Sequence, residues 1–258
     1  MTRPFRFRPS TGLLAAGLLL AGGFAQGQEA PGPWSSTFYL QQSWPKQTET
    51  NRQIKEDING TFGTTFKTWD DVANLNIGLL TLRTVTPAWK VGFEVDYSRG
   101  RIHGSAPVPD SPLGVGPGTL SFEQKYSIYA DLLAMVQYRP FGERGRFVPF
   151  LSGGVGMAYE RDTTTLGFSS SLGAGDFELL KVDNSGWFPM LTLGIGMDAY
   201  LTERRAWFLE VGLSYSWARM KHDVSAKGLL PQSAGVTTVT ADTDSTGPNV
   251  LLGIGRRF

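Results

Sequence analysis

The sequence predicts an all-β fold, an eight-stranded antiparallel transmembrane β-barrel. Three observations predict it. Apolar and polar residues alternate with a period of two in eight separate segments, as they do in strands with two unlike faces. Short and long connections between these segments alternate strictly, and aromatic residues recur near the segment ends on the apolar face.

The N-terminal segment has the pattern of a secretory signal peptide. Three arginines lie within the first eight residues, and an apolar run follows from Gly12 to Phe24. This run is too short to cross a bilayer as a stable helix, and small residues suited to signal peptidase follow in Ala25-Gln26-Gly27. We therefore expect a signal peptide over 1–27 and a barrel domain over 28–258; an uncleaved anchor helix is the alternative.

Charge and composition exclude some classes of function. The formal net charge is +1, and it falls by three to −2 without residues 1–27, which hold three arginines and no acids. A nearly neutral chain has no electrostatic footprint for nucleic acid, so we expect no nucleic-acid partner. The chain has no cysteine, so its stability must come from backbone pairing and packing. The 32 glycines and 12% aromatic residues suit alternating strands.

The eight segments can be placed along the chain. We expect strands near 34–46, 73–86, 88–101, 121–140, 146–161, 186–201, 206–221 and 247–258. The short connections are Thr86-Pro87-Ala88, Pro140 to Gly145 and Thr202-Glu203-Arg204-Arg205, and the long ones lie near 47–72, 102–120, 162–185 and 222–246. Short turns face the periplasm in such barrels, and long loops face outside. Residues 52–58 are expected to form a short helix or an added hairpin, and the last long loop a hairpin that extends the barrel.

Aromatic residues on the apolar face predict two interfacial girdles. At ~3.3 Å per residue, pairs on tilted strands are separated by roughly 20–30 Å along the membrane normal. The girdle residues are Trp34, Trp44, Trp89, Tyr97, Tyr126, Tyr138, Phe147, Tyr159, Trp207 and Trp217. The alternative is a soluble sandwich or lipocalin-like barrel with these aromatics in its core.

The opposite face of the strands predicts a charged lumen. Its charged residues are Lys90, Glu94, Asp96, Lys125, Asp131, Arg139, Asp198, Glu210 and Arg257. An eight-stranded barrel is only wide enough for side chains to fill, so these charges must pair. A plug of salt bridges is expected, and a narrow gated polar path is the alternative. Tyr39, Leu80 and Leu82 make part of the lumen apolar, which suits either a hydrophobic ligand or plain packing.

The last segment and two glycine-rich strands carry a resemblance to a known family. Val250, Leu252, Ile254 and Phe258 share one face, while Arg256 departs from the pattern. With Phe147-Val-Pro-Phe-Leu-Ser-Gly-Gly-Val-Gly-Met-Ala-Tyr159 and Leu193-Gly-Ile-Gly-Met197, the chain resembles the small eight-stranded outer-membrane barrels of the OmpA/OmpW-like, opacity-protein type. The resemblance implies the outer membrane of a Gram-negative cell and a role for Phe258 as an assembly signal.

The resemblance also implies partners and a range of functions. Expected partners are outer-membrane lipids including lipopolysaccharide, the barrel-assembly machinery during biogenesis, and a small hydrophobic solute or a host ligand. Members of the family include conduits for small hydrophobic compounds, adhesins and structural proteins, and fold alone does not decide between them. A narrow passive conduit is our first hypothesis, and a structural or surface-interaction protein acting through its extracellular loops is the second.

Catalytic chemistry has one candidate, His103-Gly-Ser105. Lipid A deacylases are similar barrels with a His-x-Ser pair, and residues two apart on a strand share a face, which would make this a lipid A-modifying enzyme. However, the pair lies beside the proline-rich segment from Ala106 to Pro117, and its neighbours of the same parity are Arg99 and Arg101 rather than carboxylates. We therefore expect a surface loop there, and we predict no catalytic residue, metal ligand or cofactor.

Overall fold

The structure is a computed structural model that describes residues 32–44, 51–69, 72, 74–109, 114 and 116–258. The expected signal peptide lies outside the described residues. Residues Gly32–Phe258 form one compact unit.

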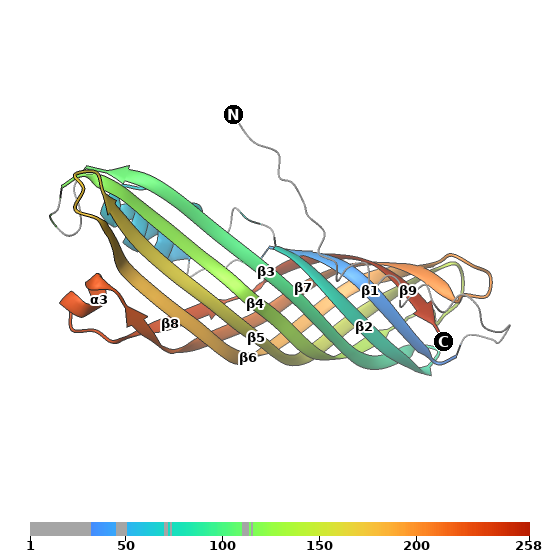
Figure 1. Ribbon diagram of the computed structural model, residues 1–258. Coiled ribbons are helices and arrows are strands. Elements are labelled where there is room, and N and C mark those ends of the chain that lie inside the picture. Colours follow the sequence, from blue (N-terminus) through green and yellow to red (C-terminus); the bar gives the residue numbers. More distant parts are fainter. Residues whose placement is uncertain (1–31, 45–50, 70–71, 73, 110–113, 115) are drawn as a thin grey trace, which may run out of the picture. The chain divides into compact units, whose positions relative to one another are not determined.

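Eight strands close into a ring in this unit (Figure 1). They are β1 (Trp34–Ser43), β2 (Asn74–Thr86), β3 (Trp89–Val108), β4 (Gly118–Tyr138), β5 (Phe147–Ser170), β6 (Asp176–Tyr200), β7 (Trp207–Lys227) and β9 (Gly247–Arg257). Each strand pairs antiparallel with the next, and β9 closes the ring between β7 and β1. The predicted eight-stranded antiparallel barrel is confirmed.

Strands β3 to β7 extend further than the sequence pattern predicted. The segments 102–120 and 162–185 were expected to be loops, but Val108 pairs with Gly118 and Ser169 pairs with Asp176, so both are mainly strand. The inward face becomes apolar in this extension, where Ile102, Leu120 and Phe168 are buried. The strands therefore continue as a wall beyond the polar lumen, and only residues 171–175 form the turn between β5 and β6.

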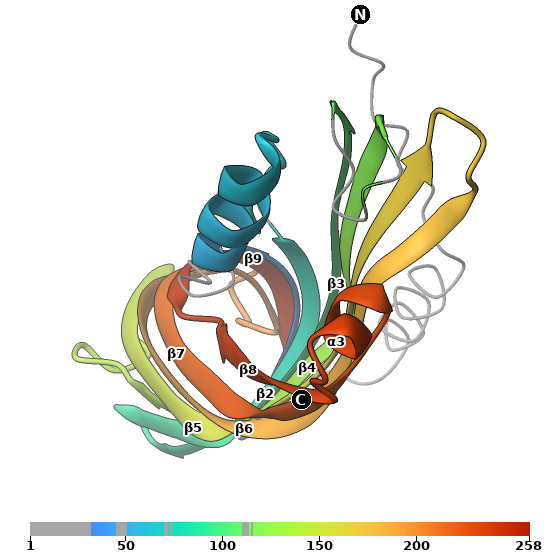
Figure 2. The ribbon, with the colours of Figure 1, turned by 90° about the vertical axis from the view of Figure 1, so that its left-hand side faces the viewer.

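A short helix and an added hairpin lie at the same end of the barrel (Figure 2). The π-helix η1 (Gln53–Gly60) confirms the helix expected at 52–58, and its buried Ile54 joins a core with Phe122 and Trp69. The strand β8 (Thr238–Asp244) pairs with β7 after the short helix α3 (Leu229–Ser233), which confirms the expected hairpin. Among the described residues, no helix is both long enough and apolar enough to span a membrane.

One β-bulge changes which residues of β4 face inward. The register of β4 against β5 shifts between Tyr126 and Ile128, and β3 against β4 shifts between Ser98 and Gly100. An extra residue in a strand moves the side chains beyond it to the other face. Lys125 is therefore exposed, and Tyr126 is buried with its ring 4.7 Å from that of Trp69. The predictions of Lys125 as a lumen residue and of Tyr126 as a girdle residue are wrong.

Candidate functional site

The outer face of the barrel carries a band of apolar side chains. Leu193, Ile195 and Leu213 are more than half exposed and point away from the lumen. A soluble protein rarely exposes a contiguous apolar surface of this size, whereas a barrel in lipid requires one. The band therefore marks the part of the wall that faces the hydrocarbon of a membrane.

Aromatic residues border the band at both ends. At one end the rings of Trp89 and Tyr138 lie 4.7 Å apart, and at the other end the rings of Tyr159 and Trp187 lie 5.1 Å apart. Trp187 was not among the predicted girdle residues. Tyr97 lies eight positions after Trp89 in β3, which is about 26 Å along the strand at ~3.3 Å per residue. The remaining predicted girdle residues are exposed or half-buried: Trp34, Trp44, Tyr97, Phe147, Trp207 and Trp217. Phe258 is exposed next to Trp34, and the amide of Phe258 donates to the carbonyl oxygen of Trp34 at 3.0 Å.

A cluster of ion pairs closes the end of the lumen that has the short turns. Glu143, in the turn between β4 and β5, was not among the predicted lumen residues. Its carboxylate accepts from Arg257 Nη1 at 2.6 Å and lies 3.1 Å from Lys90 Nζ and 3.6 Å from Arg139 Nη1. Burial alone would raise the pKa of Glu143, but Lys90, Arg257 and Arg139 together hold the pKa of that carboxyl below its usual range. We call these four residues the periplasmic lock.

Arg139 connects the lock to the wall of the barrel. Its guanidinium forms a salt bridge with the buried carboxylate of Asp198, and it donates to Gln137 Oε1 at 3.0 Å and to Tyr200 Oη at 3.4 Å. Arg139 and Asp198 are both buried. A buried pair of this kind is destabilising when one partner is removed, because the other charge is left without compensation.

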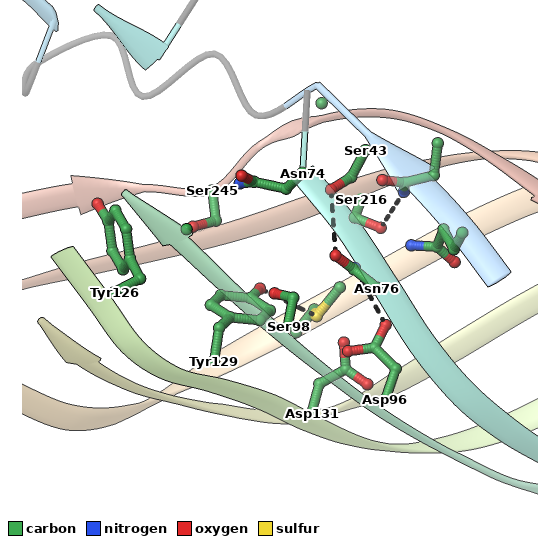
Figure 3. Close-up of a pocket in the computed structure, with 15 residues that line it drawn as sticks. Ser43, Asn74, Asn76, Asp96, Ser98, Tyr126, Tyr129, Asp131, Ser216 and Ser245 are labelled. Atoms are coloured by element: carbon green, nitrogen blue, oxygen red, sulfur yellow. Dashed lines mark hydrogen bonds between the residues drawn. The ribbon is translucent and has the colours of Figure 1, made fainter. Parts of the chain in front are cut away.

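The middle of the lumen is acidic. Glu94 accepts from Tyr39 Oη at 2.6 Å, Glu210 accepts from Thr37 Oγ1 at 2.8 Å, and Asp96 accepts from Asn76 Nδ2 at 3.5 Å. Figure 3 shows Asp96 and Asp131 pointing toward one another beneath Asn76. Apart from Lys125, the predicted lumen charges thus fall into two groups, with Lys90, Arg139, Arg257 and Asp198 at the periplasmic end and four carboxylates in the middle.

Two cavities border this acidic middle, and both are small. Each has a volume of about 40 Å³, and Asp96 and Asp131 line both. Each has room for water molecules. The side chains of the middle lumen thus leave only small cavities between them.

A larger cavity, which we call the vestibule, lies at the opposite end of the barrel, where the strands extend. It has a volume of about 310 Å³. Its walls come from η1, β4, β5, β6 and β8, and its lining residues are Gln53, Ile54, Asp57, Ile58, Phe122, Gln124, Asp162, Thr164, Leu180, Val182, Asn184, Val239, Thr240, Ala241, Asp242 and Thr243. A cavity of this size with apolar walls and a few polar groups is typical of a small-molecule site.

The wall of the barrel is interrupted beside the vestibule. Strands β6 and β7 pair at Val182 and Ala226 and again from Met190 and Ala218 onward, but residues 183–189 and 219–225, all of them described, form no ladder pair with one another. Pro189 lies in this stretch and has no N–H to donate. We call these two facing segments the wall gap.

The predicted His103 and Ser105 lie in β3 rather than in a surface loop, because the strand extends to Val108. Both are exposed. His103 faces Glu123 across the ladder, but the Glu123 carboxylate accepts from Arg101 Nη2 at 2.8 Å. Within the described part of the chain, His103 and Ser105 form no hydrogen bond with each other, and no three His, Cys, Asp or Glu residues are placed to hold a metal ion.

The closed ring, the apolar band and the aromatic residues at its borders define an integral outer-membrane β-barrel protein. Every backbone polar group in lipid must be paired, and a closed barrel achieves this without a free edge. The end with the short turns faces the periplasm, and the end with the extended wall faces outside. The chain has the architecture of the small eight-stranded, OmpA/OmpW-like outer-membrane barrels.

Solved structures of small outer-membrane barrels are similar to this chain. They include the outer membrane protein OprG from Pseudomonas aeruginosa, with 19% identity and a TM-score of 0.45 over 90% of this chain and 99% of that one. The attachment invasion locus protein Ail of Yersinia pestis has 15% identity and a TM-score of 0.40 over 88% and 99%. The E. coli outer membrane protein W has 14% identity and a TM-score of 0.38 over 90% and 100%. No family model and no curated protein matches the sequence.

Proposed function

We propose that this protein is a narrow passive conduit for small hydrophobic molecules, which enter it from outside through the vestibule. The observation that carries the proposal is the position of the 310 Å³ vestibule directly beside the wall gap. Val182 and Asn184 of β6 line the vestibule, and the unpaired stretch of β6 begins at residue 183.

The interior of the barrel supports a sideways route rather than an axial one. The two cavities below the vestibule hold only about 40 Å³ each, and the periplasmic lock closes the far end. Moving an apolar solute past four buried carboxylates would also cost free energy. The wall gap leads instead toward the membrane interface, where Trp187 is exposed.

A reversible cross-link across the wall gap tests this route. The ladder pairs on both sides place Ser185 opposite Asp223, and both side chains are exposed. The chain has no cysteine, so Ser185→Cys with Asp223→Cys introduces a single pair. We expect the oxidised variant in liposomes to lose uptake of N-phenyl-1-naphthylamine, a neutral hydrophobic dye, and reduction to restore it.

The matched control places the same cross-link where β6 and β7 are already paired. Leu193 pairs with Tyr215 in the ladder, so Leu193→Cys with Tyr215→Cys should leave uptake unchanged in both redox states. Equal uptake by the oxidised Ser185/Asp223 variant and by the wild type would overturn the conduit and favour the surface-interaction protein.

A further inference from the structure

The charged residues of the vestibule have one sign. Asp57 of η1, Asp162 of β5 and Asp242 of β8 line it, and no Lys, Arg or His is among the lining residues. Asp242 is compensated from outside the cavity, because its carboxylate lies 2.7 Å from Arg219 Nη2 and 3.6 Å from Lys221 Nζ. Asp57 and Asp162 therefore provide the negative charge that a molecule in the vestibule meets.

A buried acceptor next to Asp162 gives independent evidence of what the vestibule binds. Asn184 is 4% exposed and donates from Nδ2 to Asp162 Oδ2 at 3.3 Å. This bond leaves Asn184 Oδ1 buried without a hydrogen-bond partner. A buried acceptor without a donor is unfavourable, and an N–H group on a bound molecule would satisfy it.

The remaining walls specify the rest of the ligand. Ile54 and Ile58 of η1 lie on one side, with Leu180 and Val182 of β6 and Val239 of β8 also lining the cavity. These side chains can hold a compact hydrocarbon body but offer no polar contact to it. The charged groups are thus confined to the carboxylates, and the other polar lining groups are the amides of Gln53, Gln124 and Asn184 and the hydroxyls of Thr164, Thr240 and Thr243.

Below the vestibule, a second acidic side chain lies on the inward face of β5. Glu160, two residues from Asp162, is fully buried. Two neighbouring buried carboxyls repel each other when both are ionised, so a positive charge held at Asp162 stabilises the ionised form of the pair, whereas a negative charge opposes it.

We propose that the vestibule selects organic cations, with a hydrophobic body between η1, β6 and β8 and an ammonium group that donates to Asp162 and to Asn184 Oδ1. This inference rests on the proposed function and names its class of solute. A neutral alcohol with the same body has one O–H donor and no charge, and a carboxylate would face the aspartates with the same sign. Neither satisfies the site as an ammonium does.

Three ligands with one hydrocarbon body test the inference by isothermal titration calorimetry on the whole protein in detergent micelles. They are 1-adamantylammonium, 1-adamantanol and 1-adamantanecarboxylate. We expect the ammonium to bind at least about tenfold more tightly than the alcohol, with the carboxylate weakest. Equal affinity of the ammonium and the alcohol for the wild type would overturn the inference.

Substitutions then connect the preference to the site. Asp162→Asn should reduce the affinity for the ammonium to that for the alcohol, and Asp176→Asn, which removes the same charge from an exposed position at the rim, should not. Should Asp162→Asn not fold, Asp57→Asn changes an exposed residue of η1 and should weaken only the ammonium. A preference that survives in every folded aspartate variant would contradict the inference.

The test of the cation site can fail independently of the test of the proposed conduit. Titration measures binding in micelles without any flux, whereas the Ser185/Asp223 cross-link measures uptake of a neutral dye. Loss of the charge preference with intact, cross-link-sensitive uptake would overturn the cation site alone. Uptake that ignores the cross-link while the ammonium still binds at Asp162 would overturn the conduit alone.

Discussion

Glu143 Oε2 accepts a hydrogen bond from Arg257 Nη1 at 2.6 Å, which joins the turn after β4 to the end of β9, 114 residues later in the chain. Lys90 and Arg139 approach the same carboxylate from β3 and from the end of β4. One turn residue thus holds three cations from different parts of the ring. The periplasmic lock therefore depends on Glu143 more than on any of its partners.

Glu143→Gln should open the lumen to ions. The amide has no net charge to hold Lys90, Arg139 and Arg257 together, and three like charges in a confined space repel one another and attract water. We expect a clear rise in conductance in planar bilayers relative to the wild type. Glu203→Gln, in the exposed turn between β6 and β7, is the control and should behave as the wild type. A large steady conductance in all three proteins would contradict the lock.

The lock should also respond to acid. The pKa of Glu143 is lowered in the folded protein, so its contribution is fully present above the ordinary glutamate pKa of about 4.3 and is lost as the pH falls through the lower folded value. Wild-type conductance should therefore stay low from neutral pH down to that ordinary value and rise only below it. Bilayer recordings over a pH series measure this, and opening near neutral pH would point to a different group.

Arg139→Ala should destabilise the barrel strongly. It leaves the buried Asp198 carboxylate without its cation, and breaking a buried pair in this way costs about 3–5 kcal/mol. Urea unfolding in lipid vesicles measures the loss. Arg204→Ala, an exposed turn arginine, is the matched control and should change the unfolding free energy little. Equal effects would mean that Arg139 is solvated.

A charge on the lipid face should cost more than the same charge in a turn. Leu193 is 52% exposed in the middle of the apolar band, so Leu193→Arg should cost ~2–4 kcal/mol. Ser171→Arg, in the exposed turn between β5 and β6, should be almost neutral. The measurement is the unfolding free energy of each variant in vesicles. Similar values for the two variants would mean that Leu193 faces the lumen rather than the lipid.

Asp242→Asn should release β8 from β7. Hydrogen bonds from Arg219, with Nε at 3.0 Å and Nη2 at 2.7 Å, hold the pKa of Asp242 below its usual range. This contribution is present above the ordinary aspartate pKa of about 3.9 and is lost as the pH falls through the lower folded value. Limited proteolysis at neutral pH should cleave the β7–β8 connection faster in the variant. Asp244→Asn, a neighbour outside this ion pair, is the control.

The strands that cross the membrane were predictable because their signal is local. Each needs only a period-two alternation and a turn, and β1, β2 and β9 lie within three residues of their predicted positions, whereas β7 ends six residues later than predicted. The upper parts of β3 to β6 were missed because their apolar side chains face inward, opposite to the pattern of the band. At Ile102 and Phe122 the alternation continues, but here the apolar side chains are the buried ones.

The site was less predictable, because its parts meet only in three dimensions. A single bulge near Ser127 exchanged Lys125 and Tyr126 between faces, and no pattern in the sequence marks it. Glu143 stands in a turn, where alternation gives no information about direction. The sequence feature that pointed to Glu143 was its position four residues after Arg139, in the short connection between two strands. The vestibule needs η1 and β8, which are far apart in the sequence, to lie against β5 and β6.

The two sides of the wall gap have equal lengths. Val182 pairs with Ala226 on one side of it and Met190 with Ala218 on the other, so seven residues of each strand lie between the paired regions. Neither strand has to slide for these residues to form hydrogen bonds, and no side chain has to change face. Pairing across the wall gap would therefore keep the register that β6 and β7 already have on both sides of it.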